Sequence, residues 1–115
     1  MSEMEEGSAR SIERGPLTVR VRREVVTVRI ELDGELDMSS SEALEHELDR
    51  AAASDAGRII VDLTGLSYID SSGIGALARI PRYEQPERFR LLRAPEHVQR
   101  VLELAGLDEA VEFGE

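Results

Sequence analysis

The stretch IIVDLTGLSYIDSSGIGAL, residues 59–77, decides the fold of this chain. It opens with a nearly continuous apolar run over residues 59–63, which is typical of a strand covered on both faces of a sheet. In SSGIGALARI, the apolar residues then recur at helical spacing, which predicts a short helix with Ile74, Leu77 and Ala78 facing inward. An acid, two serines and a glycine therefore lie at the junction between a buried strand and a helix.

The segment before this stretch predicts a hairpin followed by a helix. In LTVRVRREVVTVRIELDG, residues 17–34, apolar and polar side chains alternate. This pattern predicts two strands that are each buried on one face, with a short connection at residues 22–24 and with Val26 on the buried face. GELDMSSSEALEHELDRAAASDAG, residues 34–57, then changes to helical spacing and ends at Gly57. Its N-cap candidates are Ser39, Ser40 and Ser41, and its inward stripe consists of Leu44, Leu48, Ala51 and Ala52.

Two further strands and a third helix complete the predicted fold. FRLL at residues 89–92 and EAVEF at residues 109–113 predict strands, and APEHVQRVLELAGL at residues 94–107 predicts a helix. The order β-β-α-β-α-β-α-β predicts one α/β domain over residues 16–115, with helices packed on a mixed sheet that begins with an N-terminal hairpin. Residues 1–15 are polar, and we expect them to form a disordered tail.

Composition argues against several classes of function. The chain has 115 residues, a net charge of −10, two Tyr, two Phe and no Trp, so it lacks the basic groove and stacking platforms of a nucleic-acid binder. Cysteine is absent, and His46 and His97 are isolated, so we expect neither a metal site nor a cofactor. No apolar run approaches the ~20 residues that span a bilayer, and the N-terminus has no secretory signal. We therefore expect a cytoplasmic protein without direct membrane insertion.

The residues at the junction match no catalytic motif. GIGALA at residues 73–78 fits the dinucleotide pattern G-x-G-x-x-A, but Leu92 and Arg93 stand where that pattern needs an acid. SSGIG is not the nucleophile elbow of hydrolases. A serine hydrolase would also need an acid to orient His97 toward Ser71, and none is evident. We therefore expect that the chain is not an enzyme.

Two roles stay open for the hydroxyl groups of Ser71 and Ser72. Either hydroxyl can cap the helix, whose first backbone N–H groups have no intrahelical partner. A hydroxyl at this place can also accept a phosphate, since the helix N-terminus favours negative charge. Gly73 and Gly75 would leave room around the serine, while Asp70 places a negative charge beside it.

Three stretches in the same order resemble the STAS domain, and within it most of all the bacterial anti-sigma factor antagonists. They are DGELD at residues 33–37, the opening stretch at residues 59–77, and APEHVQRVLELAGL at residues 94–107. The similarity covers roughly residues 16–113. It implies a protein that binds an anti-sigma factor with serine kinase activity and so regulates sigma-factor-dependent transcription in a stress response. It also implies release by phosphorylation of Ser71 and a phosphatase that reverses this step.

The resemblance further implies a set of site residues. Asp37 lies in the segment between the second predicted strand and the first predicted helix, here called the first loop. The resemblance implies that Asp37 lies near the phosphoacceptor and helps the kinase interaction. The expected surroundings of the phosphosite are Asp37, Asp70, Ser72, Gly73 and Gly75. The expected partner-binding residues are Glu35, Asp37, Met38, Ser39, Ser71 and Ile74. The second helix of the family usually runs longer, whereas Pro81 stands here where that helix would continue.

Two other roles within the same family remain as alternatives. The chain could be a scaffold subunit of a stress-signalling assembly, or a regulatory subunit of a membrane transporter. The stretch from Glu31 to Asp49 bears on the choice of partner, because it contains eight acids and no Arg. Such a run is either a solvated face or a surface that meets a basic partner.

Overall fold

A five-stranded sheet in the spatial order β1-β2-β3-β4-β5 is the frame of the protein, whose computed structural model describes residues 9–114. β2 runs antiparallel to both of its neighbours, β1 and β3, whereas β3, β4 and β5 run parallel to one another. The predicted mixed sheet is therefore confirmed, and so is the hairpin of β2 and β3. The strands are β1 (Ala9–Arg14), β2 (Leu17–Glu24), β3 (Thr27–Leu36), β4 (Arg58–Ile69) and β5 (Phe89–Leu92).

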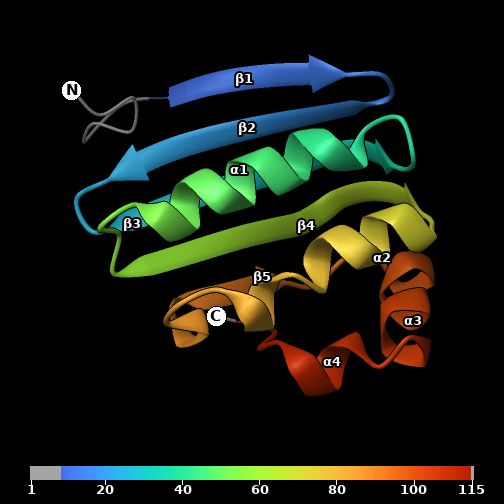
Figure 1. Cartoon of the computed structure of the whole chain (residues 1–115). Coiled ribbons are helices and arrows are strands. Elements are labelled where there is room, and N and C mark those ends of the chain that lie inside the picture. The colour runs from blue at the N-terminus through green and yellow to red at the C-terminus, as the bar shows by residue number, and fades with distance from the viewer. Residues whose placement is uncertain (1–8, 115) are drawn as a thin grey trace.

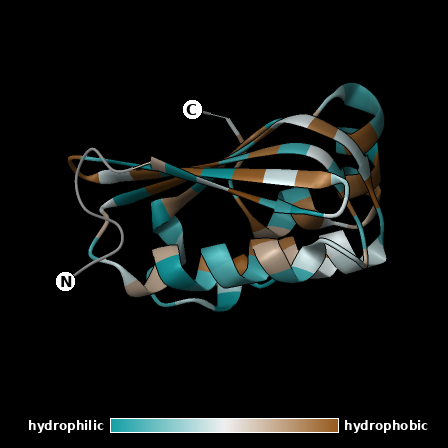
Figure 2. Cartoon of the chain, turned by 90° about the horizontal axis from the view of Figure 1, so that it is seen from above, coloured by the Kyte–Doolittle hydropathy of each residue, from teal (hydrophilic) through white to brown (hydrophobic). Residues whose placement is uncertain are grey.

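Helices connect the parallel strands and pack on the sheet. Figure 1 shows α1 in front of β2 and β3, and α2 beside the end of β4. Seen from above in Figure 2, α1 forms a separate layer below the strands. The helices are α1 (Ser41–Ala53), α2 (Ser71–Leu77), α3 (Glu96–Leu104) and α4 (Leu107–Ala110), with 3-10 turns η1 (Ile80–Arg82) and η2 (Pro86–Arg88).

The core is aliphatic, as the scarcity of aromatic residues requires. Alternate residues of β2 and β3 point into it, and β4 is buried on both faces over residues 59–61. Both patterns were predicted from the periodicity of the apolar residues. The predicted stripe of α1 is confirmed for Leu44, Leu48 and Ala51, whereas Ala52 is half-buried.

The first strand corrects one prediction. Residues 9–14 form β1, so the expectation of a disordered tail over residues 1–15 is wrong for this segment, while residues 1–8 lie outside the described residues. β1 is held by an unbroken antiparallel register with β2. Ile12 also packs against the core, and the guanidinium group of Arg10 donates to the carboxylate of Glu47 on α1. These long-range contacts offset the ordering entropy that the local sequence alone cannot offset.

The turn between β2 and β3 lies later than predicted. Glu24 pairs with Thr27, so the two-residue connection consists of Val25 and Val26 rather than residues 22–24. Val26 is 61% exposed, which makes its predicted place on the buried face wrong. The pairing of buried residues, such as Val19 with Leu32 and Val21 with Ile30, sets the register of the two strands. In this register residues 22–24, where the sequence predicted the turn, are still paired, so both strands are longer than predicted.

The C-terminal segment also differs from its prediction. Residues 107–110 form α4 instead of the start of a strand, and only Phe113 makes a single parallel bridge, to Leu91 of β5. Gly106 starts α4 with a φ of +82°, a left-handed conformation that ends α3 and turns the chain. The described residues contain no helix that is long and apolar enough to cross a membrane.

Arg88, which is distant in sequence, binds the backbone at the C-terminal end of α1. α1 ends at Ala53 and not at Gly57. The guanidinium group of Arg88 donates to the backbone oxygens of Ala52, Ser54 and Ala56, at 2.9, 3.3 and 3.0 Å. A cation at this place satisfies carbonyl groups that have no intrahelical donor and complements the negative end of the helix dipole.

Candidate functional site

The carboxyl ends of β3 and β4 bring two loops together. The strands are parallel, and their register pairs the last residue of each, Leu36 with Ile69. The backbone N–H of Asp70 also donates to the backbone oxygen of Leu36, at 3.2 Å. Asp37 and Ser71 therefore begin two neighbouring segments at one edge of the sheet.

Asp70 is the N-cap of α2. Its Oδ1 accepts the backbone N–H of Ser72 at 2.9 Å and that of Gly73 at 3.2 Å. Its backbone is extended, with φ −121° and ψ −171°, as is usual for an N-cap residue. The prediction that Ser71 or Ser72 caps this helix is wrong, because the carboxylate one residue earlier already binds the two amides that need an acceptor.

The hydroxyl group of Ser71 is left uncommitted. Ser71 is the first residue of α2 and is exposed, whereas Ser72 is half-buried. Among the residues that the structure describes, none exchanges a hydrogen bond with the Ser71 hydroxyl. The side chain can therefore be modified without breaking a contact of the fold.

The neighbouring loop is fixed around the carboxylate of Asp37. Its Oδ1 accepts the backbone N–H and the hydroxyl of Ser39, at 2.9 and 2.7 Å, and the hydroxyl of Ser40 at 3.2 Å. The hydrogen bond from the Ser39 hydroxyl is the main reason that the pKa of Asp37 lies below its ordinary value. Asp37 therefore carries its negative charge at any pH near neutrality.

Ser40 has a different role from the predicted helix cap. It occupies the N-cap position of α1, but its side chain makes no capping hydrogen bond. Its buried hydroxyl instead accepts the backbone N–H of Asp37 at 2.9 Å and lies 2.9 Å from the backbone oxygen of Glu35. Ser40 thus ties the first loop to the start of α1.

The two glycines of α2 differ in their surroundings. A Cβ atom on Gly73 would lie 2.7 Å from Ile69 Cγ1 and 2.8 Å from Leu36 Cγ, so this glycine lets α2 pack directly on the ends of β3 and β4. A Cβ atom on Gly75 would meet nothing within 4 Å. Gly75 is exposed and lies one helical turn after Ser71, on the same side of α2.

Large apolar side chains are exposed near this site. Met38, in the first loop, is 80% exposed, and Tyr68, near the end of β4, is 49% exposed. Tyr68 pairs with Glu35 across the two strands, so it belongs to the same end of the sheet. The sequence analysis named Met38 as a partner-binding residue but did not name Tyr68. The position of Tyr68, two residues before Asp70, was a signal that could have identified it. Ile74, a predicted partner residue, is half-buried and packs on the core.

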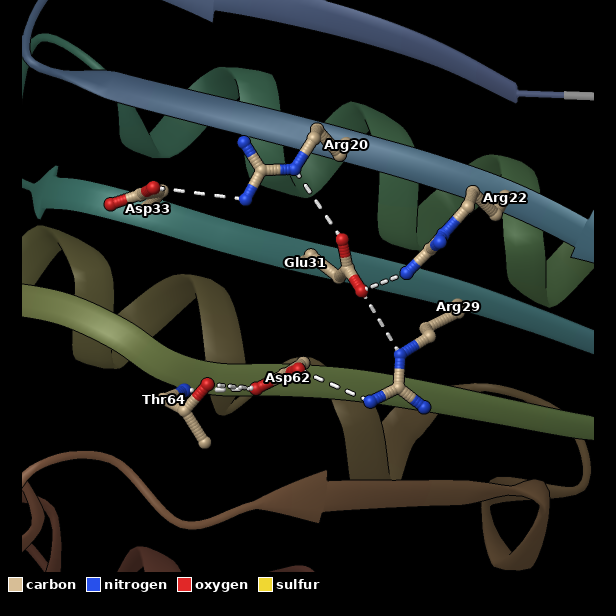
Figure 3. A network of polar contacts seen from close by, with 7 residues as sticks. All are labelled: Arg20, Arg22, Arg29, Glu31, Asp33, Asp62 and Thr64. Carbon is tan, nitrogen blue, oxygen red and sulfur yellow. Dashed lines mark hydrogen bonds and ion pairs between the residues drawn. The ribbon is translucent and has the colours of Figure 1, made fainter.

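The acidic run between Glu31 and Asp49 does not form one surface. Glu31 lies on the face of the sheet opposite α1, where Figure 3 shows three arginines around it. Arg29 Nε and Arg20 Nε lie 3.1 and 3.4 Å from its carboxylate, and Arg22 also donates to it. Burial opposes the charge of Glu31, but these hydrogen bonds outweigh burial and lower its pKa. This part of the run therefore stabilises the sheet and offers no free acidic group to a partner.

The same network continues onto β4. Arg29 Nη2 lies 3.2 Å from Asp62 Oδ2, and Asp62 Oδ1 accepts the hydroxyl of Thr64 at 2.7 Å (Figure 3). Arg20 also reaches the neighbouring Asp33, at 3.7 Å. Opposite charges alternate across three strands, so this part of the sheet face is polar and internally neutralised.

Two further acids of the run are bound by other elements. Glu47 is 4% exposed and forms an ion pair with Arg10 of β1. The carboxylate of Asp49 accepts hydrogen bonds from the hydroxyl of Tyr83 and from Arg79 Nη2, the latter at 2.8 and 3.1 Å. The Tyr83 and Arg79 hydrogen bonds lower the pKa of Asp49. Arg79 and Tyr83 thus fix the segment after α2 to α1. In this segment Pro81 lies in the 3-10 turn η1, where a longer helix was expected from the family resemblance.

The histidines have ordinary surroundings. His97 Nε2 lies 2.8 Å from the backbone oxygen of Ser67, at the start of α3. His46 is exposed on α1. Within residues 9–114, no three side chains of His, Cys, Asp or Glu are placed to hold a metal ion together.

Comparison with known proteins places this geometry in a family. A family model described as Mlab, STAS domain matches residues 19–112. The fold is similar to that of an anti-sigma factor antagonist from Mycobacterium paratuberculosis, with a TM-score of 0.76, 22% identity and 84% of each chain covered.

Two structures of SpoIIAA are more similar in sequence. The unphosphorylated form of this anti-sigma factor antagonist has a TM-score of 0.69 and 27% identity, covering 84% of this chain and 88% of that one. The phosphorylated form, from Bacillus, has a TM-score of 0.62 and 29% identity, covering 84% of this chain and 91% of that one.

Proposed function

The chain belongs to the STAS domain family, and from this premise we propose that it is an anti-sigma factor antagonist switched by phosphorylation of Ser71. The observation that carries the proposal is the exposed hydroxyl of Ser71, which follows the capping Asp70 and makes no contact that the fold needs. The likeness to SpoIIAA, solved in unphosphorylated and phosphorylated forms, supports a role for phosphate at such a site.

The unphosphorylated protein would bind an anti-sigma factor with serine kinase activity and so free a sigma factor. The contact surface would consist of the accessible groups around Ser71. They are the exposed residues Glu35, Met38, Ser39 and Tyr68, the half-buried Asp37, and the bare backbone at Gly75. Met38 and Tyr68 supply apolar area, and no side chain at Gly75 keeps a partner away from α2.

Phosphorylation would weaken this contact by charge. A phosphate adds about −1.5 to −2 charges, next to Asp70 and across from the ionised Asp37. The backbone N–H groups of Ser72 and Gly73 are already bound to Asp70, so they are not free to compensate the new anion. The uncompensated negative charge of the phosphate would therefore face the bound partner, weaken the contact and lead to release of the partner. A phosphatase acting on Ser71 would restore binding, and the chain itself would act as a binder and substrate in the cytoplasm.

The proposal is tested by a pull-down from native lysate with four forms of the protein: wild type, Ser71→Ala, Ser71→Asp and Leu104→Asp. Leu104 is 79% exposed on α3, so its variant adds the same charge at a remote place. Wild type, Ser71→Ala and Leu104→Asp should retain an anti-sigma factor, whereas Ser71→Asp should lose about ten-fold or more in affinity, because a charge is left uncompensated at a desolvated contact.

The phosphate is then located by mass spectrometry after incubation with the captured kinase and ATP. Phosphate on Ser72 with Ser71 unmodified would contradict the proposed site. Equal binding of Ser71→Asp and wild type would contradict the switch. Recovery of a megadalton assembly or of a transporter ATPase subunit in place of the anti-sigma factor would favour the scaffold or transporter role instead.

A further inference from the structure

A pocket with an apolar floor lies between the segment after α2 and the segment that contains α4. Its volume is about 230 Å³, and the buried residues Ile80, Phe89 and Val111 line it. A cavity of ~150 Å³ already holds a benzene-sized group, so this pocket has room for a large apolar side chain. It lies beyond the C-terminal end of α2, whereas Ser71 begins that helix. The pocket is therefore separate from the surface around Ser71.

Two prolines give the pocket a rigid wall. Pro81 in η1 is exposed and Pro86 in η2 is half-buried, and both line the pocket. The family resemblance predicts a longer helix here, and Pro81 is incompatible with the interior of such a helix. Phe89 is held in place by stacking on Tyr83, with 5.5 Å between the ring centroids. The pocket is thus formed before a partner binds, which lowers the entropic cost of binding.

The rim of the pocket carries charge of one sign only. The charged residues that line it are all acids, namely Glu87 on η2, Asp108 and Glu109 in the first turn of α4, and Glu112 after that helix. All four are exposed, and none forms an ion pair with a described residue. Arg88, next to Glu87 in sequence, is bound to the backbone oxygens at the end of α1. The rim therefore attracts cationic groups and repels acidic ones.

We propose that this pocket docks a segment of a partner protein in which one large apolar side chain is flanked by Arg or Lys. The apolar side chain would lie against Phe89 and the two prolines, and the flanking cations would reach carboxylates on both enclosing segments, Glu87 on one and Glu112 on the other. A desolvated apolar anchor supplies most of the affinity of such a contact, and the surrounding charges supply its specificity. The inference does not depend on the proposed switch at Ser71.

A second copy of this chain fits the pocket less well than a basic segment. The most exposed large apolar side chains of the described residues are Met38, Leu104 and Val25, at 80%, 79% and 69%. Each of them directly follows an aspartate or a glutamate in the sequence, so its insertion would bring a further negative charge to the acidic rim. Each chain also carries a net charge of −10, which adds long-range repulsion between copies.

The experiment uses the full chain, labelled with ¹⁵N, and a five-residue peptide with blocked ends that has one leucine between two pairs of arginines. We expect saturable binding that weakens with added salt, with the largest amide shifts in residues 80–89 and 107–112. The same peptide with glycine in place of leucine should bind about ten-fold more weakly or less, because it has no side chain to bury in the pocket. A peptide with glutamate in place of arginine should not bind.

Neutral variants of the rim test the selection by charge. Glu87→Gln/Glu112→Gln should bind the leucine peptide about two- to ten-fold more weakly, as expected for the loss of two exposed ion pairs. The matched control Glu13→Gln/Glu24→Gln removes two exposed acids from β1 and β2, with the same change in net charge, and should bind as wild type does.

Four results would overturn the proposal. They are equal binding of the leucine and glycine peptides, binding of the glutamate peptide, amide shifts outside residues 80–89 and 107–112, and equal binding by the two double variants. Shifts of the same residues that depend on protein concentration without peptide would assign the pocket to a second copy and would also overturn it.

Discussion

The carboxylate of Asp70 accepts the backbone N–H of Ser72 at 2.9 Å and so takes the role of helix cap that the adjacent serines could otherwise fill. This relationship separates the capping of α2 from the phosphorylation that we propose for Ser71. Asp70 stabilises α2, while the exposed Ser71 has no hydrogen-bond partner for its hydroxyl within residues 9–114. A modification of Ser71 can therefore change binding without unfolding the helix.

Removal of the Asp70 carboxylate should destabilise the protein, and removal of the Ser71 hydroxyl should not. We expect Asp70→Ala to lower the free energy of unfolding by about 0.5–2 kcal/mol, as for other N-cap deletions. Ser71→Ala should stay within about 0.5 kcal/mol of wild type. Asp70→Asn, which keeps an acceptor oxygen, is the matched control and should retain most of the stability. Urea denaturation measures all three, and a larger loss for Ser71→Ala than for Asp70→Ala would show that the serine is the cap.

The two glycines of α2 should respond oppositely to alanine. Gly73→Ala should cost about 1–3 kcal/mol, because its new Cβ would lie 2.7–2.9 Å from Ile69 and Leu36. Gly75→Ala should raise stability by about 0.5–1 kcal/mol, since the site is open and alanine favours the helix. If a partner packs on α2 beside Ser71, Gly75→Ala should also weaken anti-sigma factor binding, measured by calorimetry. Unchanged affinity in this more stable variant would remove Gly75 from the contact surface.

The ion pair between Arg10 and Glu47 should hold β1 on the domain. Glu47 is 4% exposed and Arg10 is 30% exposed, so the loss of one charge leaves the other only partly solvated. We expect Glu47→Gln to cost about 1–3 kcal/mol, less than a fully buried pair would, and to speed hydrogen exchange of the β1 amides. Glu45→Gln, at a half-buried position two residues earlier on α1 without an ion pair among the described residues, is the control. Equal exchange in both variants would show that β1 is held by its backbone pairing alone.

Acid should weaken the tie between α1 and the segment after α2. Hydrogen bonds from Tyr83 and Arg79 lower the pKa of Asp49 in the folded state. The stability that Asp49 contributes is therefore present above its unfolded pKa of about 4 and is lost as the pH falls through its lower folded value. The melting temperature of wild type should decrease below about pH 4, and that of Asp49→Asn should decrease less steeply. Melting curves at pH 7, 5, 4 and 3 give both slopes, with Asp108→Asn as a surface control, and parallel slopes for wild type and Asp49→Asn would contradict this assignment.

Much of the fold could be predicted because its signals are local. The alternation in residues 17–32 and the continuous apolar run in residues 59–63 were sufficient to identify the main strands. The family resemblance implied that Asp37 lies near the junction, and in the structure the parallel strands β3 and β4 bring the segments that follow them to one edge. The resemblance carried by residues 59–77 pointed to the family that the comparisons show.

Local patterns by themselves determined strands β2 to β5 and helices α1 to α3, because side-chain periodicity depends only on neighbours along the chain. Only the tertiary structure decided that residues 9–14 form a strand, since their order depends on pairing with β2 and on Glu47 of α1. It also decided that Asp70 caps α2. Three consecutive residues could each accept the same amides, and the extended backbone at the end of β4 aims the carboxylate at them and turns the Ser71 hydroxyl to solvent.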